Sequence, residues 1–244
     1  ELLWAASEGS AMETSTPYLL WQKILWRLLG PKSSSREEFR ERLKTSLYPA
    51  GIDKQSLALL NDVVNLGFRE TKLTESISGR LRVEQVCQFV TKLIKHRCDD
   101  HGLVLFIDDA QWLDLPSWKL LAAIVRGVDQ LVVVLGLRSA PVHQVDSVDT
   151  VLGNARDIDL GPLSEGETHA LIRECAAAET VQSIICQTVF TRSGGNPFFA
   201  VEMMRSLIDG GHAEVVDTDC LLADGRSDLS NIEFPTNIEG LITA

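Results

Sequence analysis

The feature that most limits how this chain can fold is a pair of uninterrupted apolar runs, at residues 103–107 and 131–137. A segment with helical periodicity, residues 116–126, lies between them. Strands without polar alternation, joined through helices, are typical of a parallel sheet that is buried on both faces. We therefore expect an α/β fold with a parallel sheet. Residues 156–160 are expected to add a third strand, and residues 2–6 can add another.

Helical patterns fill most of the chain before the first apolar run. An amphipathic helix is expected to start at Pro17, and a charged helix covers residues 36–47. Asp53 is placed to cap a further helix, and residues 81–97 carry one apolar stripe at helical spacing. This region therefore predicts a helical insert between a first strand and the apolar runs.

The sequence after Gly161 is helical again. Ser164 and Glu167 have the spacing of a capping box, which predicts a helix start. Asn196 as a cap and Pro197 in the first turn begin a later helix. Residues 212–231 are acidic, and we expect an irregular linker there, followed by a new element that opens at residues 234–235.

The composition excludes several classes of partner. The 244 residues carry a formal net charge of −11, which argues against direct binding of nucleic acid or an anionic membrane, since both are polyanions. No apolar run approaches the roughly 18 residues that a membrane span needs. The five cysteines form no C-x-x-C pair, so we expect free buried thiols in a cytoplasmic protein and no structural zinc.

Two adjacent acids, Asp108 and Asp109, follow the first apolar run directly. Ligands of open α/β sheets bind at the carboxyl ends of the strands, where this pair would lie. One interpretation is nucleotide hydrolysis: Asp108 holds Mg²⁺ on the phosphates, and Asp109 orients or deprotonates the attacking water. The alternative is that the two acids end a strand and solvate a loop.

The surrounding sequence resembles a known family. Residues 107–118, IDDAQWLDLPSW, are similar to the Walker B region of the signal-transduction ATPases with numerous domains. These STAND proteins are AAA-like, origin-recognition-complex-like P-loop ATPases found in LuxR-type regulators and next to class III nucleotide cyclases. Further similarities follow in the family's order: STPY at 15–18, LLN at 59–61 with RLR at 80–82, GPLS at 161–164, GGNPFF at 194–199 and FP at 234–235. The second of these favours the soluble adenylate cyclase (type 10) branch.

The resemblance implies roles for further residues. Arg138 falls where the family has its sensor arginine near the γ-phosphate, although a solvated arginine at a strand end remains the alternative. Pro197, with its cap Asn196, falls where the family's lid proline packs against the adenine. The implied cofactors are ATP and Mg²⁺. Trp112 is expected to be a packing residue and not a ligand.

The resemblance also implies a domain plan. Residues 1–160 would be the ATPase core of a three-layer P-loop fold, with a helical insert over about 17–97. Residues 161–211 would be a helical lid, and 212–244 a linker and the start of a winged-helix-like domain. The phosphate-binding signature G-x-x-x-x-G-K-[ST] is absent from the sequence. In the family its strand is central, between those that correspond here to 131–137 and 156–160, so we expect a fragment that binds ATP poorly by itself.

We expect an ATP- and Mg²⁺-binding regulatory switch that controls an output or sensor domain of a longer chain, such as a class III adenylate cyclase, and that can oligomerise. Hydrolysis by this chain alone is not expected. The alternatives are a degenerate, non-hydrolysing interaction scaffold and the ATPase module of a LuxR-type transcription regulator. An intact phosphate-binding loop upstream would favour the switch over the scaffold.

Overall fold

The computed structural model describes residues 2–12, 16–30, 35–47, 53–98, 101–138, 146–153, 155–223 and 229. The chain divides into two compact units, Glu1–Arg156 and Asp157–Ala244. Each unit has a hydrophobic core of its own, so we describe each by itself. The candidate acids belong to the first unit.

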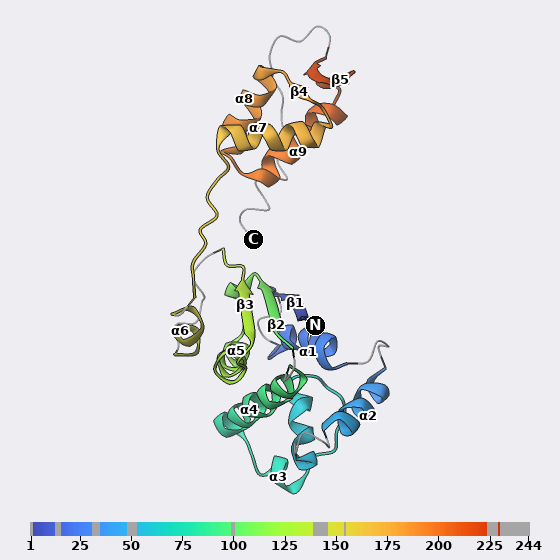
Figure 1. The fold of residues 1–244 in the computed structure, drawn as a ribbon, viewed down its shortest axis with the longest axis vertical. Coiled ribbons are helices and arrows are strands. Elements are labelled where there is room, and N and C mark those ends of the chain that lie inside the picture. Colours follow the sequence, from blue (N-terminus) through green and yellow to red (C-terminus); the bar gives the residue numbers. More distant parts are fainter. Residues whose placement is uncertain are drawn as a thin grey trace. The chain divides into compact units, whose positions relative to one another are not determined.

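The first unit is built on a parallel sheet of three strands in the order β1-β2-β3 (Figure 1). The strands are β1 (Leu3–Glu8), β2 (Leu103–Asp108) and β3 (Leu131–Leu135). In the register of the sheet, Glu8 lies opposite Asp108. The expectation of an α/β fold with a parallel sheet is confirmed. The third strand ends two residues earlier than the apolar run that predicted it.

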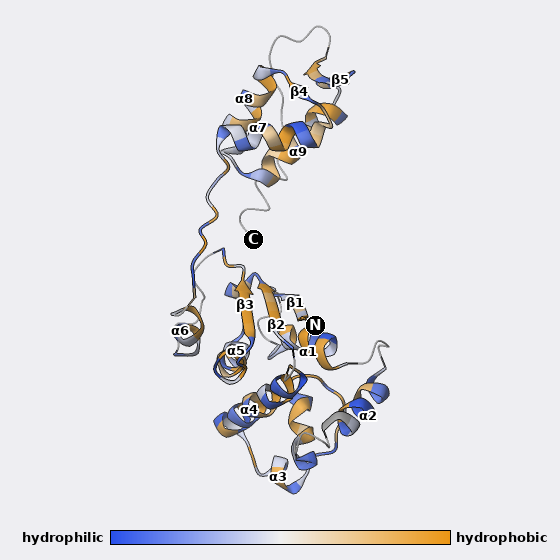
Figure 2. Ribbon diagram, in the orientation of Figure 1, coloured by the Kyte–Doolittle hydropathy of each residue, from blue (hydrophilic) through white to orange (hydrophobic). Residues whose placement is uncertain are grey.

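Three amphipathic helices cover one face of this sheet: α1 (Leu19–Leu29), α4 (Gly79–Arg97) and α5 (Leu115–Gly127). Alternate residues of the strands, such as Ala5 and Leu105, point into this layer and are fully buried. Figure 2 shows that β2 and β3 are mostly hydrophobic, whereas hydrophobic and hydrophilic residues are mixed along α1 and α4. The core of the unit therefore lies between the sheet and this helical layer.

The remaining elements of the unit form the helical insert and a late helix. They are α2 (Arg36–Leu47), the 3₁₀ helix η1 (Lys54–Asp62), α3 (Lys72–Glu75) and α6 (Asp146–Leu152). The expected cap at Asp53 is present, since its side chain accepts a hydrogen bond from Gln55 N.

One arginine joins the insert to α4. Arg82 bonds Asp62 through Nε and Nη2, both at 2.7 Å, and its Nη2 lies 2.9 Å from Glu70 Oε1. Its Nη1 donates to the carbonyl of Thr74 at 3.0 Å. Arg82 therefore ties η1, the loop after it and α3 to the fourth helix.

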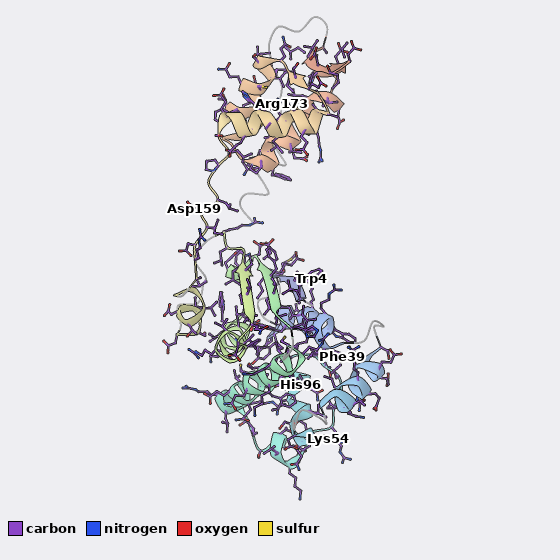
Figure 3. All side chains as sticks on the ribbon, in the orientation of Figure 1. Trp4, Phe39, Lys54, His96, Asp159 and Arg173 are labelled. Carbon is purple, nitrogen blue, oxygen red and sulfur yellow. The ribbon has the colours of Figure 1, made fainter. Side chains whose placement is uncertain are left out.

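The opposite face of the sheet is exposed. Trp4 of β1, Phe106 of β2, and Val132 and Val134 of β3 all present apolar side chains to solvent. Figure 3 labels Trp4, whose ring lies 4.7 Å from the guanidinium carbon of Arg27. The prediction of a sheet buried on both faces is therefore wrong for the described residues. The physical reason is that the helices of its core all pack on the other face.

The expectation of a strand at residues 156–160 is also wrong. The backbone of residues 155–160 forms no strand, and Leu160 is 90% exposed. Asp159 marks this segment in Figure 3. A segment becomes a strand only when a neighbouring strand receives its backbone hydrogen bonds, and no described strand pairs with this one.

The second unit contains α7 (Glu165–Ala176), α8 (Ser183–Ser193) and α9 (Pro197–Asp209) around a small core. The capping box at Ser164 and Glu167 is present. Three short strands, β4 (Thr180–Val181), β5 (Ala213–Val216) and β6 (Asp219–Leu222), form a second sheet in the order β4-β6-β5.

This small sheet corrects the expectation of an irregular linker over 212–231, because β5 and β6 pair as an antiparallel hairpin. The turn between them uses Asp217 at φ 55°, a left-handed conformation that aspartate tolerates better than most residues. The predicted new element at 234–235 lies outside the described residues.

Candidate functional site

The predicted acids lie at the carboxyl edge of the sheet. Asp108 is the last residue of β2, and its side chain is exposed there. Its Oδ1 accepts a hydrogen bond of 2.9 Å from the backbone N–H of Asp109. This hydrogen bond orients the carboxylate, and the described residues give Oδ2 no hydrogen bond, so Oδ2 is available to a ligand.

Two glycines flank this acid pair from the neighbouring strands. Gly136 follows β3, and a Cβ atom there would overlap Asp108 Oδ1 and lie 3.3 Å from its Cγ. Gly9 follows β1 and donates its N–H to the carbonyl oxygen of Asp108 at 2.9 Å. A Cβ at Gly9 would come within 2.5 Å of the carbonyl oxygen of Asp109. The position of the Asp108 carboxylate therefore requires a glycine at position 136, because a side chain there would overlap it.

Asp109 begins the turn that leaves β2. Its φ of 48° is left-handed, and it precedes the 3₁₀ turn η2 (Ala110–Trp112). Arg138, just beyond β3, places Nε 3.1 Å from Asp109 Oδ1 and is 74% exposed on its side chain. The structure therefore brings three of the five predicted site residues together: Asp108, Asp109 and Arg138.

Sequence reasoning missed Gln111. Its side chain is buried, its Nε2 donates to Asp109 Oδ1 at 3.0 Å, and its Oε1 accepts from the backbone N–H of Arg138 at 3.3 Å. A polar amide in a segment that otherwise packs two tryptophans was the available signal. Its two partners come from separate loops, so only the fold could identify them.

Asp114 anchors the loop that carries these residues. It caps α5 by accepting from the N–H and hydroxyl of Ser117 at 2.8 and 2.6 Å, and it accepts the N–H of Tyr18 at 3.2 Å. Tyr18 has φ 61°, which is unusual for a bulky residue, and burial, with smaller contributions from Cys87 and Asp114, raises the pKa of its phenol. The expected packing role of Trp112 agrees with its partial burial beside this loop.

The donor set fits Mg²⁺ held together with a nucleotide. No group of three or more His, Cys, Asp or Glu side chains in the described ranges forms a metal site by itself. Mg²⁺ in nucleotide enzymes commonly uses one or two carboxylates, with water and phosphate oxygens as the other ligands. Asp108 supplies such a carboxylate, with its position fixed by Gly136.

The other two predicted residues belong to the second unit. Asn196 is the N-cap of α9, and its Oδ1 accepts from the N–H groups of Phe198 and Phe199 at 3.0 and 3.3 Å. Pro197 occupies the first turn of that helix and is exposed. Both residues therefore have a helix-start role, as expected, and their role toward a nucleotide stays a prediction.

A parallel sheet with an acid pair at its carboxyl edge, beside an arginine, is typical of an α/β nucleotide-binding core. The family described as "AAA ATPase domain" matches residues 3–135, which is more than half of the chain, and the chain belongs to this family. The matched segment contains β1, β2, β3 and the acid pair.

The chain is also similar to part of a curated protein. The chain is 20% identical over 170 residues to adenylate cyclase type 10 of Rattus norvegicus. This alignment covers 69% of the chain and 10% of that protein. The chain thus spans about a tenth of the length of this relative. In the described part of the chain, no helix is long and apolar enough to cross a membrane.

Proposed function

We propose that this chain is the nucleotide-dependent regulatory ATPase domain of a STAND-type signalling switch, which binds ATP with Mg²⁺. The observation that carries the proposal is the contact of Asp109 with Arg138 beside Asp108, at the carboxyl edge of a parallel sheet. Membership of the AAA ATPase domain family supports the choice of nucleotide.

Each residue of the cluster has a distinct task in this proposal. Asp108 would hold Mg²⁺, which would supply positive charge to neutralise the phosphates. Asp109 accepts a proton from the attacking water while the water oxygen bonds to the γ-phosphorus. The bond from that phosphorus to the bridging oxygen breaks, and the oxygen leaves on ADP with the electron pair. Arg138 leaves Asp109 and binds the γ-phosphate, because an exposed guanidinium can move and binds phosphate strongly.

The phosphate-binding part of the site is proposed to come from a further strand, loop and helix beside β3. Among the described residues β3 is an edge strand. Its outer edge and the exposed side chains of Phe106, Val132 and Val134 are the surfaces that such a unit would pair with and cover. A loop after that strand would lie at the same edge as Asp108, since all strands of a parallel sheet end together.

The second unit is proposed to act as the lid. Pro197 and its cap Asn196 would contact the adenine, and the lid would differ between the ATP and ADP states. The similarity to adenylate cyclase type 10 favours a class III cyclase as the output domain. A scaffold without hydrolysis is the competing proposal, and the exposed apolar face of the sheet would then bind a partner protein.

Substitution of the metal carboxylate tests the proposed function. In the full-length protein, Asp108→Asn is expected to lower Mg²⁺-dependent ATP hydrolysis by at least roughly 100-fold while the fold is retained. The matched control is Asp129→Asn, since Asp129 is an exposed carboxylate paired only at the surface with Lys95. The measurements are phosphate release, binding of a fluorescent ATP analogue and circular dichroism.

The results separate the two proposals. Hydrolysis that falls in Asp108→Asn but not in the control supports the switch. Nucleotide binding without any hydrolysis in the unmodified protein supports the scaffold. Equal turnover in the two variants removes Asp108 from the metal role. Arg138→Ala adds a second readout, because loss of the γ-phosphate contact should reduce the preference for ATP over ADP.

A further inference from the structure

The loop that follows β2, from Asp109 to Asp114, contains one deeply buried polar side chain, the amide of Gln111. Gln111 is 3% exposed, whereas Asp109 and Arg138 reach solvent. A buried amide needs hydrogen-bond partners for both of its ends. Gln111 satisfies one end on the carboxylate of Asp109 and the other on the backbone of Arg138. The side chain therefore joins the loop after β2 to the loop after β3.

The two carboxylate oxygens of Asp109 differ in their contacts, and its two hydrogen-bond donors differ in burial. Both the Gln111 amide and the Arg138 guanidinium reach Oδ1, at 3.0 and 3.1 Å. Two donors on Oδ1 leave Oδ2 as the oxygen that can receive a proton. The two donors also differ in burial: the guanidinium is 74% exposed, while the amide is held inside the protein. The guanidinium can leave for a phosphate, and the amide stays.

We propose that Gln111 is the positioning residue for Asp109. It holds Oδ1 toward the protein, so that Oδ2 faces the attacking water, and it keeps this orientation after Arg138 moves to the γ-phosphate. Through its second hydrogen bond it ties the carboxylate to the strand end that carries Arg138. This inference rests on the proposed function, since it assigns a role within the same hydrolysis.

A double-mutant cycle in the full-length protein tests the proposal. Gln111→Leu replaces the amide with an apolar side chain of similar volume and removes both hydrogen bonds. We expect kcat for ATP hydrolysis to fall roughly 10- to 100-fold with KM within about two-fold, because orientation of the base acts in the transition state and not in substrate binding. In an Asp109→Asn background the same substitution should cause no further loss. Gln88→Leu, at an exposed amide of α4, is the control and should leave kcat unchanged.

A purely structural role predicts a different pattern. Loss of packing would lower kcat to a similar extent in both backgrounds, and that additive result would overturn the proposal. An unchanged kcat in Gln111→Leu would overturn it as well. If the unmodified protein shows no Mg²⁺-dependent hydrolysis, the proposed function itself fails, which is a separate outcome.

A second variant covers the case in which Gln111→Leu does not fold. Gln111→Glu keeps the shape and the acceptor for the Arg138 N–H, but it removes the donor to Asp109 and brings a second carboxylate against Oδ1. We expect the same loss of kcat together with a lower thermal midpoint at neutral pH, because burial of a second carboxylate beside that of Asp109 is unfavourable. Full activity of this variant would show that the donor to Asp109 is not needed.

Discussion

Removal of the Arg82 side-chain charge gives the sharpest test of how the helical insert is held. The guanidinium, which is 22% exposed, makes three hydrogen bonds to the carboxylates of Asp62 and Glu70 and one to the carbonyl of Thr74. In Arg82→Met the apolar stem is retained, and two acids and a carbonyl lose their donor. Breaking a fully buried ion pair costs about 3–5 kcal/mol, and breaking an exposed one costs at most about 1 kcal/mol. The partial exposure of this network places the expected loss at about 2–3 kcal/mol.

Hydrogen exchange measures this loss of stability separately for each segment of the chain. Amides of η1, α3 and the first turns of α4 should exchange about 30 to 150 times faster, since each 1.4 kcal/mol is about tenfold in an opening equilibrium. Arg80→Met is the matched control, because Arg80 is 89% exposed and makes a single i,i+4 pair with Glu84. That pair is worth about 0.3–0.5 kcal/mol, which predicts about a twofold change. Equal exchange in the two variants would refute the assignment of Arg82 as the tie between these elements.

Two further predictions concern the metal carboxylate and acid stability. Gly136→Ala should displace the carboxylate of Asp108 by about 1 Å, and a displacement of that size costs roughly 100-fold in Mg²⁺-dependent hydrolysis. Hydrogen bonding from Thr74, followed by that from Arg82, lowers the pKa of Glu70. Because the folded-state pKa lies below that of the unfolded chain, the stabilisation by Glu70 is complete above the unfolded pKa and is lost as pH falls through the folded value. Urea midpoints between pH 6 and pH 3 should therefore fall less steeply in Glu70→Gln.

The controls for these two experiments come from the same chain. Gly161→Ala adds a Cβ where no atom lies within 4 Å, so hydrolysis should be unaffected. Equal activity in the alanine variants at 136 and 161 would contradict the packing of glycine against Asp108. For the acid transition, Glu37→Gln changes an exposed carboxylate of α2 in the same insert. If the urea midpoint changes with pH equally in Glu70→Gln and Glu37→Gln, Glu70 is not the source of the pH-dependent stability.

Sequence patterns predicted the helices and strands that are determined by residues close to them in the chain. The apolar run before Asp108 predicts a buried strand whichever neighbours it has, and the cap at Asn196 and its following proline set a helix start through adjacent residues. The segment 156–160 alternates charged and apolar residues, as a strand with one buried face does, but no described strand pairs with it. Its conformation depends on a partner strand, which the local pattern does not reveal. The hairpin of β5 and β6 was missed because its strands are only four residues each, too short for a clear alternation, and lie in a segment that is acidic overall.

The candidate site divides in the same way. Asp108 and Asp109 follow from their position after a strand, and the resemblance to a family suggested Arg138. Gln111 and Gly136 act through contacts with residues 2 and 28 positions away, which are set by the sheet register and by the turn after β2. Spacing alone gives no information on such contacts. The fold is therefore needed to recognise both residues.

The uncovered side of the sheet also affects how the molecule behaves in concentrated solution. Aromatic and branched side chains lie along β-strands beside a backbone edge that no described strand pairs with, and this arrangement favours edge-to-edge association of identical copies. Light scattering should thus increase with protein concentration and with added salt, since a net charge of −11 is then screened and repulsion between copies weakens. Threonine at Val132 and Val134 would keep the branched shape while making that surface more hydrophilic.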